Sequence, residues 1–293
     1  MASSERPAPG RAQAPRIDAH HHLWHIARGD YGWLTPDSGF LYRDHGPEHF
    51  KPLLDAHGIG HAVVIQAAPS TAETDFLLSL ASQHRYLAAV VGWVDFASPQ
   101  APDSLARFAQ HPKFRGVRPM LQDIEDAAWV LRPELRPVFE LLVERGLRFD
   151  ALIQPRHLPS LVTLSERHPG LRICINHCGK PEVRDWQAGD ADFQAWARGM
   201  RTLAGNARVA CKLSALPTRA APGWNAQVFA PYAEVLFGAF GDGRLMWASD
   251  WPILERNGDY GRWWHVAQEL TPAAARDEVF GLAAQRFYDL PLD

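Results

Sequence analysis

The segment RIDAHHHLW, which covers residues 16–24, places three histidines in succession after a short patterned run. Side chains alternate between the two faces of a β-strand, so His20 and His22 would point the same way and His21 the other way. Two imidazoles on one strand face can meet one metal ion or one carbonyl oxygen. A purification tag is a poor explanation, because three histidines are too few for one. The His-x-His pattern alone is a weak signal, so other residues must support it.

Other short apolar segments of the chain also end in polar or ionisable residues. NHCGKP supplies His177 and Lys180, and ASDWP supplies Asp250. Further segments end in Gln66, Arg118, Gln154 and Lys212. In a barrel of parallel strands, catalytic groups collect at the carboxyl ends of the strands. Gln66 and Gln154 are candidate substrate-binding residues, although a capping or solvated role explains them equally well. That role explains the histidines and the aspartate poorly as a set.

The histidines and the aspartate indicate chemistry at an acyl carbonyl. The set offers nitrogen and carboxylate ligands for one zinc-like ion with an open coordination position, and its members are His20, His22, His177 and Asp250. Alternatively, the imidazoles polarise the carbonyl without a metal. In either case we expect Asp250 to take a proton from an attacking water. No Gly-x-Ser-x-Gly nucleophile elbow is present, which favours water as the nucleophile.

Cationic and aromatic residues complete the expected substrate site. We expect three cations to contact substrate hydroxyls or a carboxylate: Arg118, Lys180 and Lys212. Lys180 could also stabilise a developing oxyanion. Trp33, in a long connection over residues 23–46, and Trp251, beside Asp250, are candidate pocket walls, although packing explains either one equally well.

The elements that must position these residues alternate between strands and helices. Strands are expected over residues 16–20, 62–66, 88–94, 116–120, 148–153, 172–176, 208–212 and 245–248. Helical patterns lie between them, over residues 73–83, 104–110, 133–145, 159–167, 192–203, 227–240 and 262–270. This alternation predicts an α/β fold, a (β/α)8 TIM-type barrel in a single domain, with some distortion allowed. An open doubly wound sheet is less well supported, because no Gly-x-Gly-x-x-Gly follows the first strand.

Composition narrows the class of partner. The net charge is −3 with Lys and Arg scattered along 293 residues, so no nucleic-acid partner is expected, and no run of eighteen apolar residues predicts a membrane span. We expect a small-molecule substrate; oligomeric state leaves no signal. Three cysteines and no apolar signal core favour the cytoplasm. Residues 1–15 are expected to form a flexible tail, and residues 16–293 the barrel.

The motifs, taken in order, resemble those of the amidohydrolase superfamily, of the amidohydrolase 2 type. They are IDAHHHLW, VVIQAAPSTAETDFLL, FRGVRPMLQ, INHCGKP, CKLSAL and MWASDWP. More narrowly, the chain is similar to (β/α)8 lactonases of the L-fuconolactonase, L-rhamnonolactonase and dicarboxylate-lactone type. The likeness runs from about residue 16 to the C-terminus. NHCGKP and SDWP are fairly specific, whereas His-x-His is not.

The resemblance implies roles for individual residues. His20 and His22 match the strand-one pair, and His177 matches the strand-six histidine. Asp250 matches the strand-eight aspartate that activates water. Three cations match positions that face the substrate: Arg118, Lys180 and Lys212. Strand four has no Lys or Glu to bridge two metals, and strand five ends in Gln154 rather than His, so a binuclear centre is not expected. The lactonase branch includes members that work without metal, so one zinc-like ion and none remain open.

The leading hypothesis is therefore a hydrolase that opens a lactone ring, with a sugar aldonolactone as its substrate. One alternative is a metal-dependent non-oxidative decarboxylase of the same superfamily. Another is a hydrolase of a carboxylated lactone from aromatic degradation. A sugar-binding barrel without activity is disfavoured by the intact set of histidines and aspartate.

Overall fold

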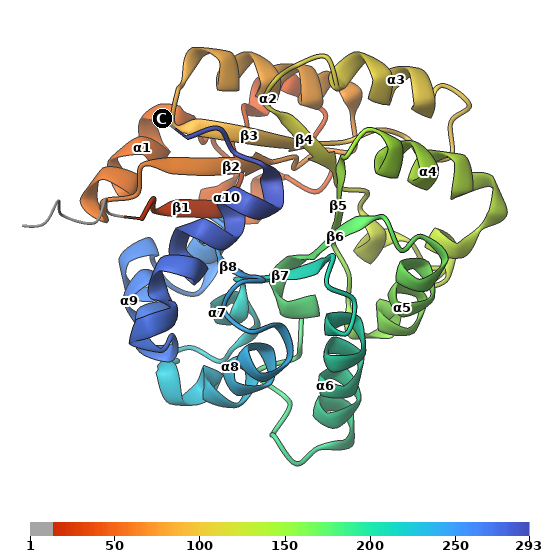
Figure 1. Cartoon of the computed structure of the whole chain (residues 1–293). Coiled ribbons are helices and arrows are strands. Elements are labelled where there is room, and N and C mark those ends of the chain that lie inside the picture. The colour runs from red at the N-terminus through yellow and green to blue at the C-terminus, as the bar shows by residue number, and fades with distance from the viewer. Residues whose placement is uncertain (1–13, 293) are drawn as a thin grey trace, which may run out of the picture.

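Eight parallel strands follow one another in chain order around a single sheet (Figure 1). The computed structural model describes residues 14–292. The strands are β1 (Ile17–His21), β2 (His61–Ile65), β3 (Leu87–Gly92), β4 (Phe114–Val117), β5 (Arg148–Ala151), β6 (Arg172–Ile175), β7 (Val209–Leu213) and β8 (Leu245–Trp247). Almost every strand residue is buried, as expected of parallel strands that are covered on both faces.

Helices alternate with the strands and surround them (Figure 1). Within the described residues they are α1 (Pro47–Ala56), α2 (Thr71–Gln83), α3 (Ala101–Phe108), α4 (Arg136–Glu144), α5 (Leu158–Arg167), α6 (Ala191–Ala204), α7 (Leu216–Arg219), α8 (Ala226–Phe240), α9 (Tyr260–Leu270) and α10 (Ala283–Tyr288). Side-chain caps start several of them: Ser70 accepts from the Glu73 amide, and Asp259 accepts from the Arg262 amide. The predicted (β/α)8 barrel is confirmed.

The barrel closes where the chain leaves β1 and β8. The Asp250 amide donates to the His20 carbonyl at 2.9 Å, and the His22 amide donates to the Trp251 carbonyl at 2.8 Å. Below these bonds, the buried Asp18 carboxylate accepts from the Ser249 amide at 3.0 Å. Tyr260 of α9 donates to the other Asp18 oxygen at 3.0 Å. We call this join the β1–β8 seam; it brings the first and last strands together at the carboxyl end of the barrel.

Apolar side chains fill both sides of the strand cylinder. One cluster joins the strands to the surrounding helices. A second joins alternate strand residues to α10, and its members include Ile17, Ala19, Val63, Ile65, Ala89, Val91, Cys174, Ala210, Met246 and Ala248. The end of α10 contacts the first residues of β5 and β6, where Arg148 donates to the Phe287 carbonyl at 2.6 Å and Arg172 pairs with Asp289. This helix therefore covers the amino-terminal end of the barrel, opposite the seam.

The observed elements differ from the predicted ones in a few places. Helices α1, α7 and α10 were not predicted, and the connection over residues 23–46 contains two short 3-10 helices, Ile26–Arg28 and Pro36–Leu41. The predicted tail over residues 1–15 lies outside the described residues except for its last two positions, and it stays a prediction, as does the start of the barrel domain. Between residues 14 and 292, no helix is both long and apolar enough to cross a membrane.

Candidate active site

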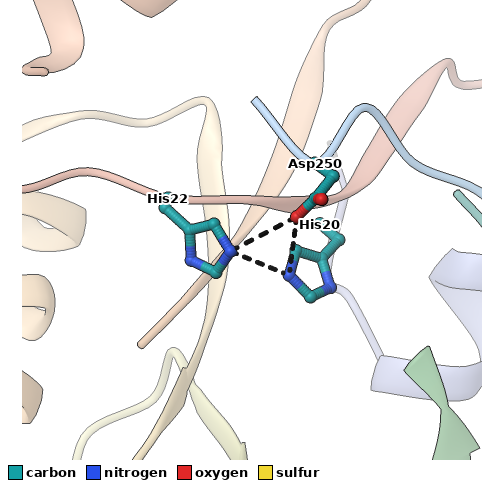
Figure 2. A group of neighbouring side chains, drawn as sticks. All are labelled: His20, His22 and Asp250. Carbon is teal, nitrogen blue, oxygen red and sulfur yellow. Dashed lines mark hydrogen bonds and ion pairs between the residues drawn. The ribbon is translucent and has the colours of Figure 1, made fainter. Parts of the chain in front are cut away.

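Three side chains from the two ends of the chain meet at the β1–β8 seam (Figure 2). The Nε2 atoms of His20 and His22 lie 3.2 Å apart. The Asp250 Oδ1 atom lies 3.4 Å from His22 Nε2 and 3.7 Å from His20 Nε2. All three residues are buried. His21 points the other way and stacks on Phe50 at a ring distance of 3.9 Å, as strand alternation predicts.

His177 joins this group from the turn that follows β6. Its Nε2 atom lies 3.6 Å from Asp250 Oδ1, and its ring lies 4.5 Å from that of His20. The Nδ1 atom of His177 is 2.9 Å from the Ser214 hydroxyl, just beyond β7. The structure therefore brings together His20, His22, His177 and Asp250, which the sequence places at the ends of three different strands.

Two members of the group have left-handed backbone conformations. The φ angle is 55° at His177 and 59° at Asp250. A residue other than glycine in this region costs about 1–3 kcal/mol, and such residues concentrate at functional sites. This conformational cost is present at the two turns that place His177 and Asp250 next to each other.

A cavity of about 230 Å³ opens in front of this group. Its lining is His22, Trp33, Ala67, Arg118, Met120, Gln122, Asp123, Leu152, His177, Lys180, Asp250, Ile253 and Arg256. Five residues predicted for the site therefore line this cavity together with Asp250. His20 lies behind His22 and is not part of this lining. Arg256 and Asp123 were not predicted; their only signal is that each lies in a connection that follows a barrel strand.

Gln66 supports Arg118 rather than facing the cavity. Its side-chain amide donates to the Arg118 carbonyl at 2.7 Å. In return, the Arg118 guanidinium donates to the Gln66 carbonyl and lies 3.3 Å from Gln66 Oε1. These bonds hold the guanidinium with one nitrogen 3.4 Å from His20 Nε2. Arg118 is thus fixed between the cavity and the histidines.

Lys212 lies beneath the cavity instead of in its wall. Its ammonium is fully buried and pairs with Asp150 at 2.5 Å, and it is 3.3 Å from His20 Nδ1. Asp150 also accepts from Tyr288 of α10 at 2.9 Å and from Asn176 at 3.0 Å. Lys212 therefore does not line the cavity, as a substrate contact would. It contacts His20 from the inside of the barrel.

Two other expected substrate contacts also lie outside the cavity lining. Gln154 is at the start of a short 3-10 helix, where its side-chain oxygen accepts from Arg156 at 3.1 Å. Trp251 is buried against Phe50 at a ring distance of 5.1 Å and donates to Glu255 at 2.9 Å. Trp251 therefore packs behind the seam.

Burial sets the charge state of the site. Burial lowers the pKa of His20, His22 and His177, so the imidazoles are neutral at pH 7. Burial alone would raise the pKa of Asp250, but His177, His22 and the Lys180 ammonium lower it below its ordinary value. A carboxylate thus stands among neutral imidazoles at neutral pH.

The cations of the cavity are also affected by burial. Burial lowers the pKa of Lys180 to about 8, against the attraction of Asp250. It lowers the pKa of Arg118 to about 10, again against Asp250. Arg118 is therefore charged at neutral pH, and Lys180 is mostly charged. The cavity combines one base with two nearby positive charges.

Three ligand atoms from His20, His22 and Asp250 lie within 4.8 Å of one another, a donor set that suits zinc. The Nδ1 atom of His22 is 2.9 Å from the Ile65 carbonyl. It must donate there, which leaves the Nε2 lone pair free for an ion. His20 suits an ion less well, because the Lys212 ammonium and the Arg118 guanidinium both approach its ring.

The three cysteines are buried and free, as expected for packing residues.

Comparison with known proteins supports a common ancestry over the whole barrel. The profile of the amidohydrolase family matches residues 17–290. An L-fucono-1,5-lactonase of Burkholderia ambifaria is 41% identical over 280 residues, which is 93% of this chain and 95% of that protein. An L-fucono-1,5-lactonase of Burkholderia multivorans is 34% identical, over 95% of this chain and 97% of that protein.

A solved structure has the same overall fold. The crystal structure of an amidohydrolase from Burkholderia multivorans with bound zinc has a TM-score of 0.88 and 32% identity. The match covers 95% of this chain and all of that chain. The sequence motifs, the eight-stranded barrel and these relatives agree: the chain belongs to the amidohydrolase family.

Proposed function

We propose that this chain hydrolyses the ring ester of a lactone, with a sugar aldonolactone as the substrate. The observation that carries the proposal is the position of Asp250, an ionised carboxylate that faces three neutral imidazoles beside a cavity with two cations, the buried Arg118 and the half-buried Lys180. The relatives named L-fucono-1,5-lactonase support this class of reaction over decarboxylation.

Asp250 is proposed as the base that activates water. Its distances to the three imidazoles, 3.4–3.7 Å, exceed those of ordinary hydrogen bonds. Its oxygens therefore keep lone pairs for a water molecule in the cavity. The water gives one proton to Asp250 while its oxygen bonds to the lactone carbonyl carbon.

Arg118 and Lys180 are proposed to stabilise the oxyanion that forms. We assign the tautomers from the hydrogen-bond partners. His22 Nδ1 donates to the Ile65 carbonyl, so a neutral His22 carries no proton on Nε2. His22 then has only an acceptor on that side, so it cannot donate to a carbonyl. The cations of the cavity wall can do so, and preorganised charges at a developing oxyanion supply a large part of catalysis.

Collapse of the tetrahedral intermediate breaks the bond between the carbonyl carbon and the ring oxygen. The ring oxygen leaves as an alkoxide and takes the proton from Asp250. The product is an open-chain hydroxy acid, and Asp250 is again ionised. His177 lies 3.6 Å from Asp250 and lines the cavity beside it.

A divalent ion, when bound, would be held by His20, His22 and Asp250 and would act as a Lewis acid toward the carbonyl. The chain's own charges at Arg118 and Lys180 offer the same polarisation from the cavity wall. A lactone that carries a carboxylate is a second candidate substrate, because Arg256 adds a third cation to the lining.

The test is turnover of a panel of aldono-1,4-lactones and aldono-1,5-lactones, followed by acid release with a pH indicator. We expect Asp250→Asn to lower kcat by about 100- to 10,000-fold, because it removes the base and keeps the shape. Circular dichroism checks that the variant is folded. Asp185→Asn, at an exposed carboxylate away from the cavity, is the matched control and should retain wild-type turnover.

Two results would reject the proposal. The first is a wild-type protein that releases acid from no lactone of the panel. The second is an Asp250→Asn variant that keeps turnover within a few-fold of wild type. A variant that still binds lactone but does not turn it over supports an enzyme rather than a binding protein.

A further inference from the structure

A second cavity adjoins the first one at the mouth of the barrel. Its volume is about 360 Å³, and it shares three lining residues with the first cavity: Trp33, Met120 and Asp123. Its remaining lining comes from the connections that follow β1 to β4: Gly32, Pro69, Trp93, Val94, Asp95, Phe96, Pro119, Ile124 and Trp129. The proposed hydrolysis uses none of these other residues.

Trp33 forms a fixed wall between the two cavities. Its indole nitrogen donates to the Ala67 carbonyl at 2.7 Å. Its ring packs edge-on against the buried Trp24 at a ring distance of 5.4 Å. A side chain held at both its polar and its apolar parts is preorganised, so a ligand loses little in ordering it.

The second cavity differs from the first in having no cation in its lining. The first cavity carries Arg118, Lys180 and Arg256 beside two carboxylates, whereas the charged residues of the second cavity are Asp95 and the shared Asp123. The rest of its lining is apolar, with four aromatic rings: Trp33, Trp93, Phe96 and Trp129. Such a lining binds a flat apolar group and disfavours an anion.

Trp93 is placed to present its ring to this cavity. The Thr74 hydroxyl donates to the Trp93 carbonyl at 3.0 Å and accepts from the Trp93 amide at 2.8 Å. These two bonds hold the main chain from α2, on the outside of the barrel. Neither bond involves the side chain of Trp93, which is only partly buried.

We propose that the second cavity is a subsite for an uncharged, flat apolar substituent on the lactone, of which an aryl ring is the model. This inference rests on the proposed lactone hydrolysis, because it concerns the substituent of that substrate. A ligand site for a small organic molecule usually measures about 300–1,000 Å³. The first cavity, at about 230 Å³, lies below that range, which suits the ring of a lactone alone, and the second adds room for a substituent.

The experiment compares three forms of the aldonolactone that the wild-type protein hydrolyses best: the parent, its mono-O-methyl ethers and its mono-O-benzyl ethers at each hydroxyl. The kinetic constants are measured for wild type, Trp93→Ala and Trp186→Ala. Trp186 is partly buried and lines a different cavity, near α5 and α6, so it is the matched control. Dissociation constants come from calorimetry on Asp250→Asn, which separates binding from turnover.

We expect one benzyl ether to bind about tenfold or more tightly than the methyl ether at the same oxygen, because burial of an aromatic ring is worth at least that much. Trp93→Ala should remove most of this gain and leave the parent lactone's kinetic constants within twofold of wild type. Trp186→Ala should keep the gain.

The inference is overturned if no benzyl ether binds more tightly than its methyl counterpart, or if the gain survives Trp93→Ala. Turnover of the parent lactone with no benzyl gain rejects the subsite alone. Absence of turnover with every lactone rejects the proposed function; calorimetry with the ethers of L-fucono-1,5-lactone then still decides whether the subsite binds the aryl group.

Discussion

The positive charges around Asp250 differ in how firmly they are held at neutral pH. Arg118 is fixed by Gln66 and keeps its charge throughout the physiological range. Lys180 lies at a left-handed turn with φ of 52°, contacts Gln122, and has a pKa lowered to about 8 by burial. The charge of the Lys180 ammonium therefore changes close to working pH, and this makes the residue open to a direct test.

The pH dependence of kcat/KM should report Lys180. A lowered lysine pKa means that the charged form is present below about 8 and is lost as pH rises through that value. We therefore expect catalysis to fall above about pH 8, after subtraction of the spontaneous hydrolysis of the lactone. In Lys180→Arg the charge persists at higher pH, so the fall should move upward. A profile unchanged by this substitution would exclude Lys180 from the charged machinery.

Removal of divalent ions tests whether a bound metal, rather than Arg118 and Lys180, polarises the lactone carbonyl. Because two cations approach His20, and because Arg118 and Lys180 already face the cavity, we expect lactone hydrolysis to persist within about twofold after dialysis against a chelator. The measurement pairs elemental analysis with initial rates. A loss of activity that zinc restores would show that the ion at His20, His22 and Asp250 is required.

The barrel strands supply the positions of the site, and sequence reasoning finds them because each is a short, mostly apolar segment that alternates with a helical pattern. All eight expected strands overlap the observed ones. Helix α1 was missed because Pro47 and Pro52 interrupt its pattern, although Pro47 stands at the first turn, where proline is tolerated. Periodicity thus identifies the fold, while short proline-containing helices need tertiary packing to be recognised.

Depth within the barrel explains which expected contacts fail to reach the cavity. Lys212 is the last residue but one of β7 (Val209–Leu213) and points inward below the rim, whereas Lys180 lies beyond the end of β6 (Arg172–Ile175) and reaches the cavity. A shift of a few residues along a strand separates a supporting lysine from a substrate-facing one, and a sequence pattern does not resolve that shift. Arg256, in a turn after β8, depends on how the connection folds back.

The pair between β5 and β7 gives a prediction about stability. Lys212→Met leaves the buried Asp150 carboxylate without its cation, so we expect the free energy of unfolding to fall by about 3–5 kcal/mol. Urea denaturation measures this change. Addition of Asp150→Asn in the same chain should recover a large part of the loss. Equal losses for the single and double variants would argue against a coupled pair.

At the scale of the whole molecule, the β1–β8 seam joins the first strand to the segment after the last one, and it contains one buried carboxylate. Asp18 accepts from Ser249 and from Tyr260, and burial raises its pKa to about 6. An acid with a raised folded-state pKa binds protons more tightly in the native state. Its contribution to stability is therefore greatest below pH 4 and declines as pH rises toward about 6.

The raised pKa of Asp18 gives a testable prediction about the pH dependence of stability. We expect the stability advantage of wild type over Asp18→Asn to shrink by about 3 kcal/mol between pH 3.5 and pH 7, from a shift of roughly two pKa units. Urea denaturation of both proteins across this range measures the difference, in which other titrating groups cancel. A difference that is independent of pH, or that grows with pH, would contradict the raised pKa.

The meeting of His20 with residues some 229 positions later has a consequence for how the protein matures. During synthesis, His20 and His22 are made early, whereas Asp250 is added only after β8. No fragment that ends before β8 can turn over substrate. The return of activity during refolding should therefore coincide with the docking of the last strand against the first. The time course of recovered turnover would then measure when the barrel is complete.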